Sequence, residues 1–332
     1  MAEKVSTTYM QKQWEHELLY WVNSLHLTRG ARVAVSTADG GIYMFNADGE
    51  LLWDYEAEDS IRAMAVVEDA SCIAAGTDGG EVLLLSNRRK LIWCHELESR
   101  VGFVSVPSDG SFVAAGAGGW LYVFSRRGKL LWSSKVARSV DSVSASANGS
   151  CIAVGARNLS SGKVCLFDRH GDVLWERKIG WSLAGSVKVA ASQRGMLIAA
   201  GSLHGVRMFD AGGECLWYYE TGGSVEDLVF SPDGNYGVAG TLDGAVYLFS
   251  KDGMVWSRKL KSSIRAVGIS EAGCSVAALD NGFIYLFDRE GEILWEKETY
   301  GGICSIDISR DGSCIAVGSE DGIVYMFSRR RT

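Results

Sequence analysis

Proline is almost absent from this chain, which has 2 prolines and 40 glycines among its 332 residues. Proline removes a backbone donor and is excluded from the middle of a sheet, so its scarcity leaves long stretches of the chain free to pair as strands. Glycine adopts the positive φ that tight hairpin turns need. The composition therefore favours many short strands joined by tight turns.

The chain also lacks the marks of a membrane-spanning, secreted or nucleic-acid-binding protein. No apolar run approaches the roughly 18 residues of a membrane helix, and residues 1–8 have no apolar stretch of the kind found in a secretory signal. The formal net charge is −7, whereas nucleic-acid-binding domains are usually basic. We expect a cytoplasmic protein that binds neither a membrane nor nucleic acid.

Catalytic and metal-binding spacings are missing as well. The histidines lie far apart and form no His-x-x-x-His pair and no Cys/His cluster with metal spacing. No Gly-x-Ser-x-Gly elbow and no Asp-x-Asp-x-Asp-Gly calcium loop occurs. The sequence predicts no enzyme activity, no cofactor and no metal site.

The eight cysteines include no Cys-x-x-Cys pair. Three of them, Cys72, Cys151 and Cys314, stand at the same place in copies of Ser-Cys-Ile-Ala, so each belongs to a different repeat unit. Free cysteine in a reducing compartment behaves as a small apolar side chain. We expect small buried thiols without disulfides.

What the chain does contain is a repeat of about 40 residues, marked by tryptophan. Successive tryptophans of the series are separated by 39, 40, 39, 43, 42, 39 and 39 residues. The series consists of Trp14, Trp53, Trp93, Trp132, Trp175, Trp217, Trp256 and Trp295. A fixed period of this length is the signature of a repeat architecture.

Each unit carries four strand-like segments. In the last unit, the apolar pattern of Ile303, Ile306 and Ile308 precedes the small-residue segment 314–318 and the aromatic segment 325–327. In most units, a fourth segment that ends in Leu-Trp follows the aromatic one. The segments are short, rich in β-branched and aromatic residues, and bounded by Gly or Asp-Gly turns. Four short antiparallel strands per unit predict the blade of a β-propeller.

The units resemble two known families of propeller repeat. The segments Asp288-Arg-Glu-Gly-Glu-Ile-Leu-Trp295 and Asp168-Arg-His-Gly-Asp-Val-Leu-Trp175 resemble the repeats of quinoprotein-type, pyrroloquinoline-quinone-like (PQQ-like) propellers. The turn Ser231-Pro-Asp-Gly234 resembles that of WD repeats. The resemblance covers nearly the whole chain and implies a propeller architecture. By analogy with both families, the V-x-x-V strand is innermost and the tryptophan strand outermost.

The repeat predicts a single all-β domain over 1–332, an eight-bladed propeller with four antiparallel strands per blade. Blades one to seven are expected at 21–56, 61–96, 101–135, 140–178, 186–220, 224–259 and 263–298. The eighth blade, at 302–332, lacks an outermost strand, and Trp14 lies in phase with the repeat without inner strands before it. We therefore expect residues 8–17, within a closing segment 1–18, to complete blade eight.

Two insertions interrupt the period, and function in a propeller is expected where the repeat is broken. The segments 157–162 and 179–185 should project from one face, the top face, which also carries the loops between blades. Candidate partner-binding residues there are Asn158, Leu159, Trp181 and Leu183, because tryptophan is enriched at binding hot spots. The alternative is that Trp181 packs as a lid on its own blade.

A second candidate surface is the mouth of the central channel. The residue after the first apolar position of each innermost strand should ring the mouth, and these residues are Asn23, Arg62, Gly102, Asp141, Lys188, Glu226, Arg265 and Cys304. Lys188, Glu226 and Arg265 alternate in sign on neighbouring blades. They could form a ring of ion pairs or a site for a charged peptide or small anion. Tyr300 in the loop before the last blade is a further candidate.

We predict a non-catalytic interaction scaffold that docks a protein partner or larger complex on the top face, with a propeller that is itself monomeric. The alternative is a ligand-binding or enzymatic propeller with a quinone or small anion at the central channel. Short loops leave little material for a lidded active site, which favours the scaffold.

Overall fold

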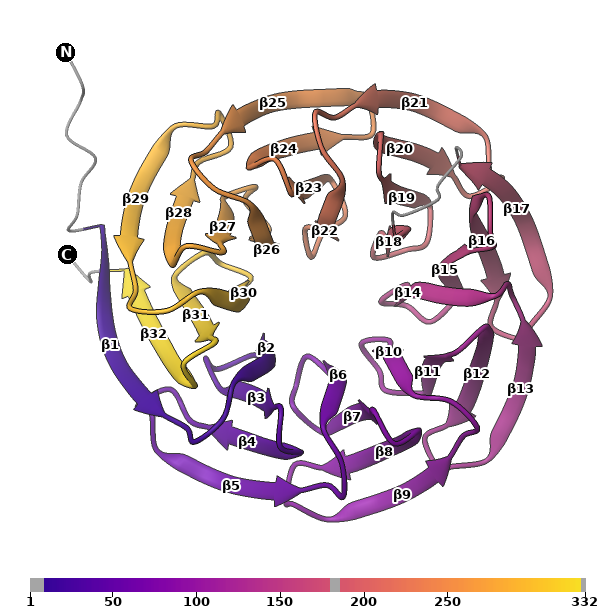
Figure 1. Ribbon diagram of the computed structural model, residues 1–332, viewed down its shortest axis with the longest axis horizontal. Coiled ribbons are helices and arrows are strands. Elements are labelled where there is room, and N and C mark those ends of the chain that lie inside the picture. The colour runs from indigo at the N-terminus through magenta and orange to yellow at the C-terminus, as the bar shows by residue number, and fades with distance from the viewer. Residues whose placement is uncertain (1–8, 180–185, 330–332) are drawn as a thin grey trace.

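Eight four-stranded antiparallel sheets follow one another around a central channel in the computed structural model, which describes residues 9–179 and 186–329 (Figure 1). Seven of the sheets consist of four strands that are consecutive in the chain and run in order from the centre of the ring to its rim. The predicted eight-bladed propeller with four strands per blade is confirmed. Among the described residues there is no helix long and apolar enough to cross a membrane.

The strands of the first four blades, from the innermost to the outermost, are as follows. Blade one has β2 (Val22–Leu27), β3 (Val33–Thr37), β4 (Gly41–Phe45) and β5 (Leu51–Glu56). Blade two has β6 (Ile61–Val66), β7 (Cys72–Thr77), β8 (Glu81–Ser86) and β9 (Leu91–Glu96). Blade three has β10 (Val101–Ser105), β11 (Phe112–Ala117), β12 (Trp120–Ser125) and β13 (Leu130–Lys135). Blade four has β14 (Ser139–Ala145), β15 (Cys151–Arg157), β16 (Gly162–Asp168) and β17 (Val173–Ile179).

The remaining blades repeat this order. Blade five has β18 (Lys188–Ala191), β19 (Leu197–Ser202), β20 (Gly205–Asp210) and β21 (Cys215–Glu220). Blade six has β22 (Val225–Phe230), β23 (Tyr236–Thr241), β24 (Ala245–Ser250) and β25 (Gly253–Lys259). Blade seven has β26 (Ile264–Ile269), β27 (Ser275–Leu279), β28 (Phe283–Phe287) and β29 (Ile293–Glu298). Blade eight has β30 (Ile303–Ile308), β31 (Cys314–Ser319), β32 (Ile323–Arg329) and β1 (Met10–Glu17).

The two ends of the chain meet in blade eight, as the position of Trp14 predicted. β1 pairs antiparallel with β32, from Met10 opposite Arg329 to Glu17 opposite Ile323. Figure 1 shows β1 at the rim beside β32. The pairing covers the outer edge of β32 and closes the ring, so the backbone groups of this apolar strand are not available for another chain to pair with.

The tryptophans of the repeat join each blade to the next. The Trp14 ring lies 5.8 Å from the Phe45 ring of the following blade, and its Nε1 donates to the Ala47 carbonyl at 2.9 Å. A Cβ on Gly49, whose φ is +85°, would lie 2.7 Å from Trp14 Cγ, so only glycine fits beneath the indole. The same indole-to-carbonyl bond recurs at Trp93, Trp132, Trp175, Trp217 and Trp256.

No disulfide joins any of the eight cysteines, all of which lie in the described part of the chain, but the thiols are not uniformly buried. Cys94 and Cys215 are exposed on outermost strands, where side chains alternate between the blade interface and solvent, so the expectation of burial is wrong for these two. Burial raises the pKa of Cys165 to about 12. The Cys94 sulfur is only partly covered, and this partial loss of solvent together with the nearby Glu81 carboxylate raises its pKa to about 11. These two thiols therefore stay protonated at neutral pH, which makes them weak nucleophiles.

Candidate binding site at the mouth of the channel

Seven of the eight innermost strands carry a β-bulge at the residue that the sequence placed at the channel mouth. In β6, for example, Ile61 pairs with Thr77 and Ala63 with Gly76, which leaves Arg62 without a partner residue. A bulge bends its strand and redirects the side chain of the extra residue. The bulged residues are Asn23, Arg62, Gly102, Asp141, Glu226, Arg265 and Cys304. The V-x-x-V spacing, one residue longer than strand alternation, is the sequence signal for this bulge.

Lys188 is the exception, and its predicted place in the ring was wrong. β18 has no bulge, and Lys188 pairs directly with Gly201. In the neighbouring blades the residues opposite the equivalent glycines are Ser142 and Asp227, which lie one position beyond the bulge. Blade five is one residue shorter here, so Lys188 lies one step deeper along its strand.

Lys188, Glu226 and Arg265 do not form the ring of ion pairs that was one of the two expectations for them. No ion pair in the described part of the chain joins any two of these residues. Arg265 instead has its Nη2 4.0 Å from Glu320 Oε1 in the adjacent blade. With half of both side chains exposed, this pair contributes little to stability.

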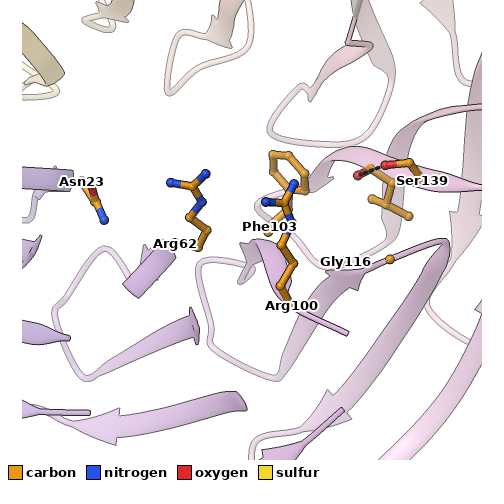
Figure 2. Close-up of a pocket in the computed structure, with 9 residues that line it drawn as sticks. Asn23, Arg62, Arg100, Phe103, Gly116 and Ser139 are labelled. Atoms are coloured by element: carbon orange, nitrogen blue, oxygen red, sulfur yellow. Dashed lines mark hydrogen bonds between the residues drawn. The ribbon is translucent and has the colours of Figure 1, made fainter. Parts of the chain in front are cut away.

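A pocket of about 290 Å³ opens at the mouth, beside blades two, three and four (Figure 2). Arg62 and Arg100 extend in the same direction from neighbouring blades, and Phe103 forms part of the wall. The remaining lining residues are Asn23, Gly102, Gly116, Gly118, Ser139 and Val140. Of the lining residues, Asn23, Arg62 and Gly102 were in the predicted ring, and only Arg62 was a candidate binding residue; Arg100 and Phe103 were missed.

The pocket exists because blade three has glycine where other blades have side chains. Gly102 holds the bulge position, and a Cβ there would find no atom within 4 Å. Gly118, with φ +56°, forms the turn above it. Phe103 is half-buried against the core shared by blades three and four, so its ring is held firmly in the wall.

The mouth of the pocket is cationic. Arg62 Nε lies 3.5 Å from Asp78 Oδ1, with both side chains partly exposed. Arg100 has no ion pair or side-chain hydrogen bond with any described residue, and the same holds for the side chain of Arg138 on the next loop. The adjacent turns 118–119 and 158–161 contain no acidic residue. Two guanidinium groups beside an aromatic wall suit a carboxylate, because arginine presents several donors in a planar fork.

The structure removes Asp141 from the candidate partner-binding residues. Its side chain is buried, with Arg157 Nε 3.2 Å from Oδ1 and the Val187 backbone N–H donating to Oδ2 at 3.2 Å. Burial raises the pKa of Asp141, and the Arg157 guanidinium opposes that rise. Asp141 therefore ties blade four to blade five and is not free to contact a partner.

The other candidates divide into exposed residues and residues outside the described part. Leu159 and Tyr300 are largely exposed on the top face, and Asn158 Oδ1 accepts the Arg138 backbone N–H at 3.1 Å. Glu226 is half-buried. Trp181 and Leu183 lie outside the described residues.

Below the mouth, side chains of one innermost strand hydrogen-bond the backbone of the next. Asp227 Oδ2 accepts from Val267 N at 2.9 Å, and Asp307 Oδ2 accepts from Leu27 N at 2.8 Å. Ser144 Oγ accepts from Ala191 N at 3.0 Å. These bonds satisfy backbone donors on the inner edges of blades one, five and seven, where no further strand can pair. They line a channel of about 630 Å³, whose carboxylates the sequence analysis did not identify.

The channel carboxylate Asp307 gives a pH-dependent prediction. Burial in the wall raises its pKa, while His26 opposes that rise. Protonation of Asp307 therefore stabilises the folded state. This contribution to the unfolding free energy is complete below about pH 4 and is lost as the pH rises through the raised pKa. Asp307→Asn should flatten the fall in unfolding free energy as the pH rises above about 4, the ordinary pKa range of a free aspartate. Urea midpoints measured from that pH upward test it, and a variant that runs parallel to wild type would contradict it. Asp252→Asn, on an exposed turn, is the control.

Comparison with known proteins supports the repeat assignment. A PQQ-like family model described as outer membrane protein assembly factor BamB matches residues 38–194, just under half of the chain. The predicted resemblance to PQQ-like propellers is confirmed. A model for a family of unknown function matches residues 204–321.

Solved structures show the same architecture. The computationally designed Ika8 protein superposes with a TM-score of 0.83 at 18% identity, covering 96% of this chain and 99% of that one. BamB from Moraxella catarrhalis has a TM-score of 0.76 at 15% identity, with the same coverage of 96% and 99%. At these identities the likeness concerns the fold.

Proposed function

We propose that this chain is a non-catalytic interaction scaffold, and that its top face docks an acidic segment of a protein partner at the mouth of the channel. The observation that carries the proposal is the pair Arg62 and Arg100 over a pocket with an aromatic wall. Arg100 has no carboxylate partner among the described residues and Arg62 has only the partly exposed 3.5 Å contact with Asp78, so the two cations attract an acidic ligand and speed its association. We further propose that the propeller is a monomer in the cytoplasm, since exposed free cysteines suit a reducing compartment.

Two further observations support a scaffold over an enzyme. The family model that matches residues 38–194 is named for an assembly factor, a description that fits contact with other proteins. The three buried or half-buried aspartates at the channel, Asp141, Asp227 and Asp307, each accept backbone hydrogen bonds from the next blade. They hold the ring together, which is a structural role.

Charge reversal of the pocket tests this proposal. The double variant Arg62→Glu/Arg100→Glu should weaken binding of acidic peptides, selected from a random displayed library on the immobilised protein, by at least about tenfold. Most of the loss should be in the association rate, and it should shrink as salt is added. Biolayer interferometry of the selected peptides measures both effects.

The matched control is Arg88→Glu/Arg89→Glu, which makes the same charge change on a turn of blade two between its third and fourth strands, at the opposite face. It should leave binding unchanged. Equal losses in both double variants would show that net charge alone drives binding and would contradict the proposal. A thermal shift with a small anion or quinone, without selection of any peptide, would instead favour the small-ligand alternative.

A further inference from the structure

The loop that joins β1 to β2 differs from every other loop between blades in the described part of the chain. It has Leu19, Tyr20 and Trp21 where the next loop has Glu58, Asp59 and Ser60. The three side chains are 94%, 50% and 63% exposed. Single exposed apolar residues are normal on a protein surface. Three adjacent ones, at loop positions where the other blades mostly have polar or small residues, require another explanation.

This loop is held rigidly in place. The Leu18 backbone N–H donates to the Gly322 carbonyl at 2.9 Å in blade eight, and the Ala38 N–H donates to the Trp21 carbonyl at 3.0 Å in blade one. Leu18 itself is buried in the core between these blades. The apolar side chains therefore project from a fixed backbone. A partner that binds them would lose little free energy to ordering of the loop.

Tyr300 belongs to the same surface. It is the counterpart of Leu19 in the preceding loop and is 94% exposed. Its loop touches the same turn of blade eight: the Glu320 N–H donates to the Gly302 carbonyl at 2.8 Å, and a Cβ on Gly301 would lie 2.8 Å from Asp321 Cγ. Leu19, Tyr20, Trp21 and Tyr300, here called the seam patch, thus flank the top of the blade that closes the ring.

The centre of the seam patch is acidic. Glu320 and Asp321 occupy the turn between the two loops, and both are exposed. Glu320 has one ion pair, the 4.0 Å contact with Arg265, and no ion pair among the described residues includes Asp321. This charge is opposite to that of the pocket lined by Arg62 and Arg100.

We propose that the seam patch is a second docking surface, for a protein segment that presents a large apolar or aromatic side chain next to lysine or arginine. The exposed aromatic side chains provide the anchor contacts, since tryptophan and tyrosine dominate binding energy at interfaces. The carboxylates of Glu320 and Asp321 select the basic neighbour, because complementary charge sets partner choice. This surface goes beyond the proposed acidic-segment site and does not depend on it.

The test replaces the loop with one that the fold already uses. Leu19→Glu/Tyr20→Asp/Trp21→Ser installs the residues of the next loop, Glu58, Asp59 and Ser60, so folding should be preserved and is checked by thermal melting. Random displayed peptides are selected on immobilised wild type, with counter-selection on the loop variant. The selected peptides should combine Trp, Phe or Leu with Lys or Arg, and the loop variant should bind them at least about tenfold more weakly by fluorescence anisotropy.

Three further variants locate the contact. Glu320→Lys/Asp321→Lys should weaken the same peptides several-fold, as should Tyr300→Ser. Leu131→Ser, which removes an exposed apolar side chain from an outermost strand, should have no effect. Arg62→Glu/Arg100→Glu should also have no effect, which separates this surface from the acidic-segment site.

Several outcomes would overturn the proposal. These are failure to select any peptide that distinguishes wild type from the loop variant, selection of acidic peptides, or equal binding by the charge-reversed turn. Wild type that dimerises in sedimentation velocity while the loop variant stays monomeric would assign the seam patch to a second copy of the chain. Binding of the patch to anionic lipid vesicles in place of peptides would also overturn the proposal.

Discussion

A chain without residues 1–18 is expected to melt about 10 °C below the full chain and to aggregate at concentrations at which the full chain does not. The deletion removes β1, which supplies every backbone pair along the outer edge of β32. It also removes three apolar side chains: Met10, which is 3% exposed in the core of blades seven and eight, Trp14, which packs against Phe45 of blade one, and the buried Leu18. Burial of such side chains contributes about 1.5–3 kcal/mol each, so a loss of about 5–9 kcal/mol is expected.

Aggregation should follow from the exposed edge. Without β1, the buried residues Val324 and Met326 of β32 lie at an open strand edge, which is a template for pairing with another chain. Differential scanning fluorimetry and light scattering measure the two effects. The matched control begins at Tyr9 and keeps all of β1, so it should melt like the full chain. Equal melting of the two truncated chains would mean that β1 does not close the ring.

The architecture could be predicted because the same strand pattern occurs in each of the eight units of the repeat. Trp14 lies in phase with the series but has no inner strands before it, and this single residue predicted both the eighth blade and its closure. The V-x-x-V spacing likewise located the bulges, although the sequence alone did not identify them as bulges. Patterns set by strand alternation and interblade packing are local, so they can be read from the order of residues.

The site could be predicted only in part, because it depends on residues from different blades. Arg62 was identified from its place in the innermost strand, but Arg100 lies in a loop, and the space beside it comes from Gly102. Asp141 looked like a residue of the channel mouth, yet Arg157 and the backbone of Val187 bury it. Spacing within one repeat does not show which side chains of neighbouring blades meet.

The missing residue in blade five and the seam patch are two further features that the sequence analysis did not identify. Lys188 was placed in the ring because it follows Val187, the first apolar residue of its strand. Val187 and Val189 are only two residues apart, which is ordinary strand alternation, and this shorter spacing marks the missing bulge residue. Leu19, Tyr20 and Trp21 fall between strands, where no apolar period calls attention to them. Their meaning appears only when the loops are compared with one another and their exposure is known.

Replacement of Trp295 by alanine is expected to lower the free energy of unfolding by about 3–5 kcal/mol, because the indole is the most deeply buried of the repeat tryptophans. It is 2% exposed, lies 5.1 Å from the Phe327 ring, and fills the space between blades seven and eight. Urea unfolding should show a lower midpoint with an unchanged slope. The control is Trp21→Ser, which removes an indole that is 63% exposed and should shift the free energy by less than about 0.5 kcal/mol. A Trp295→Ala variant as stable as that control would show that the tryptophan series does not hold the blades together.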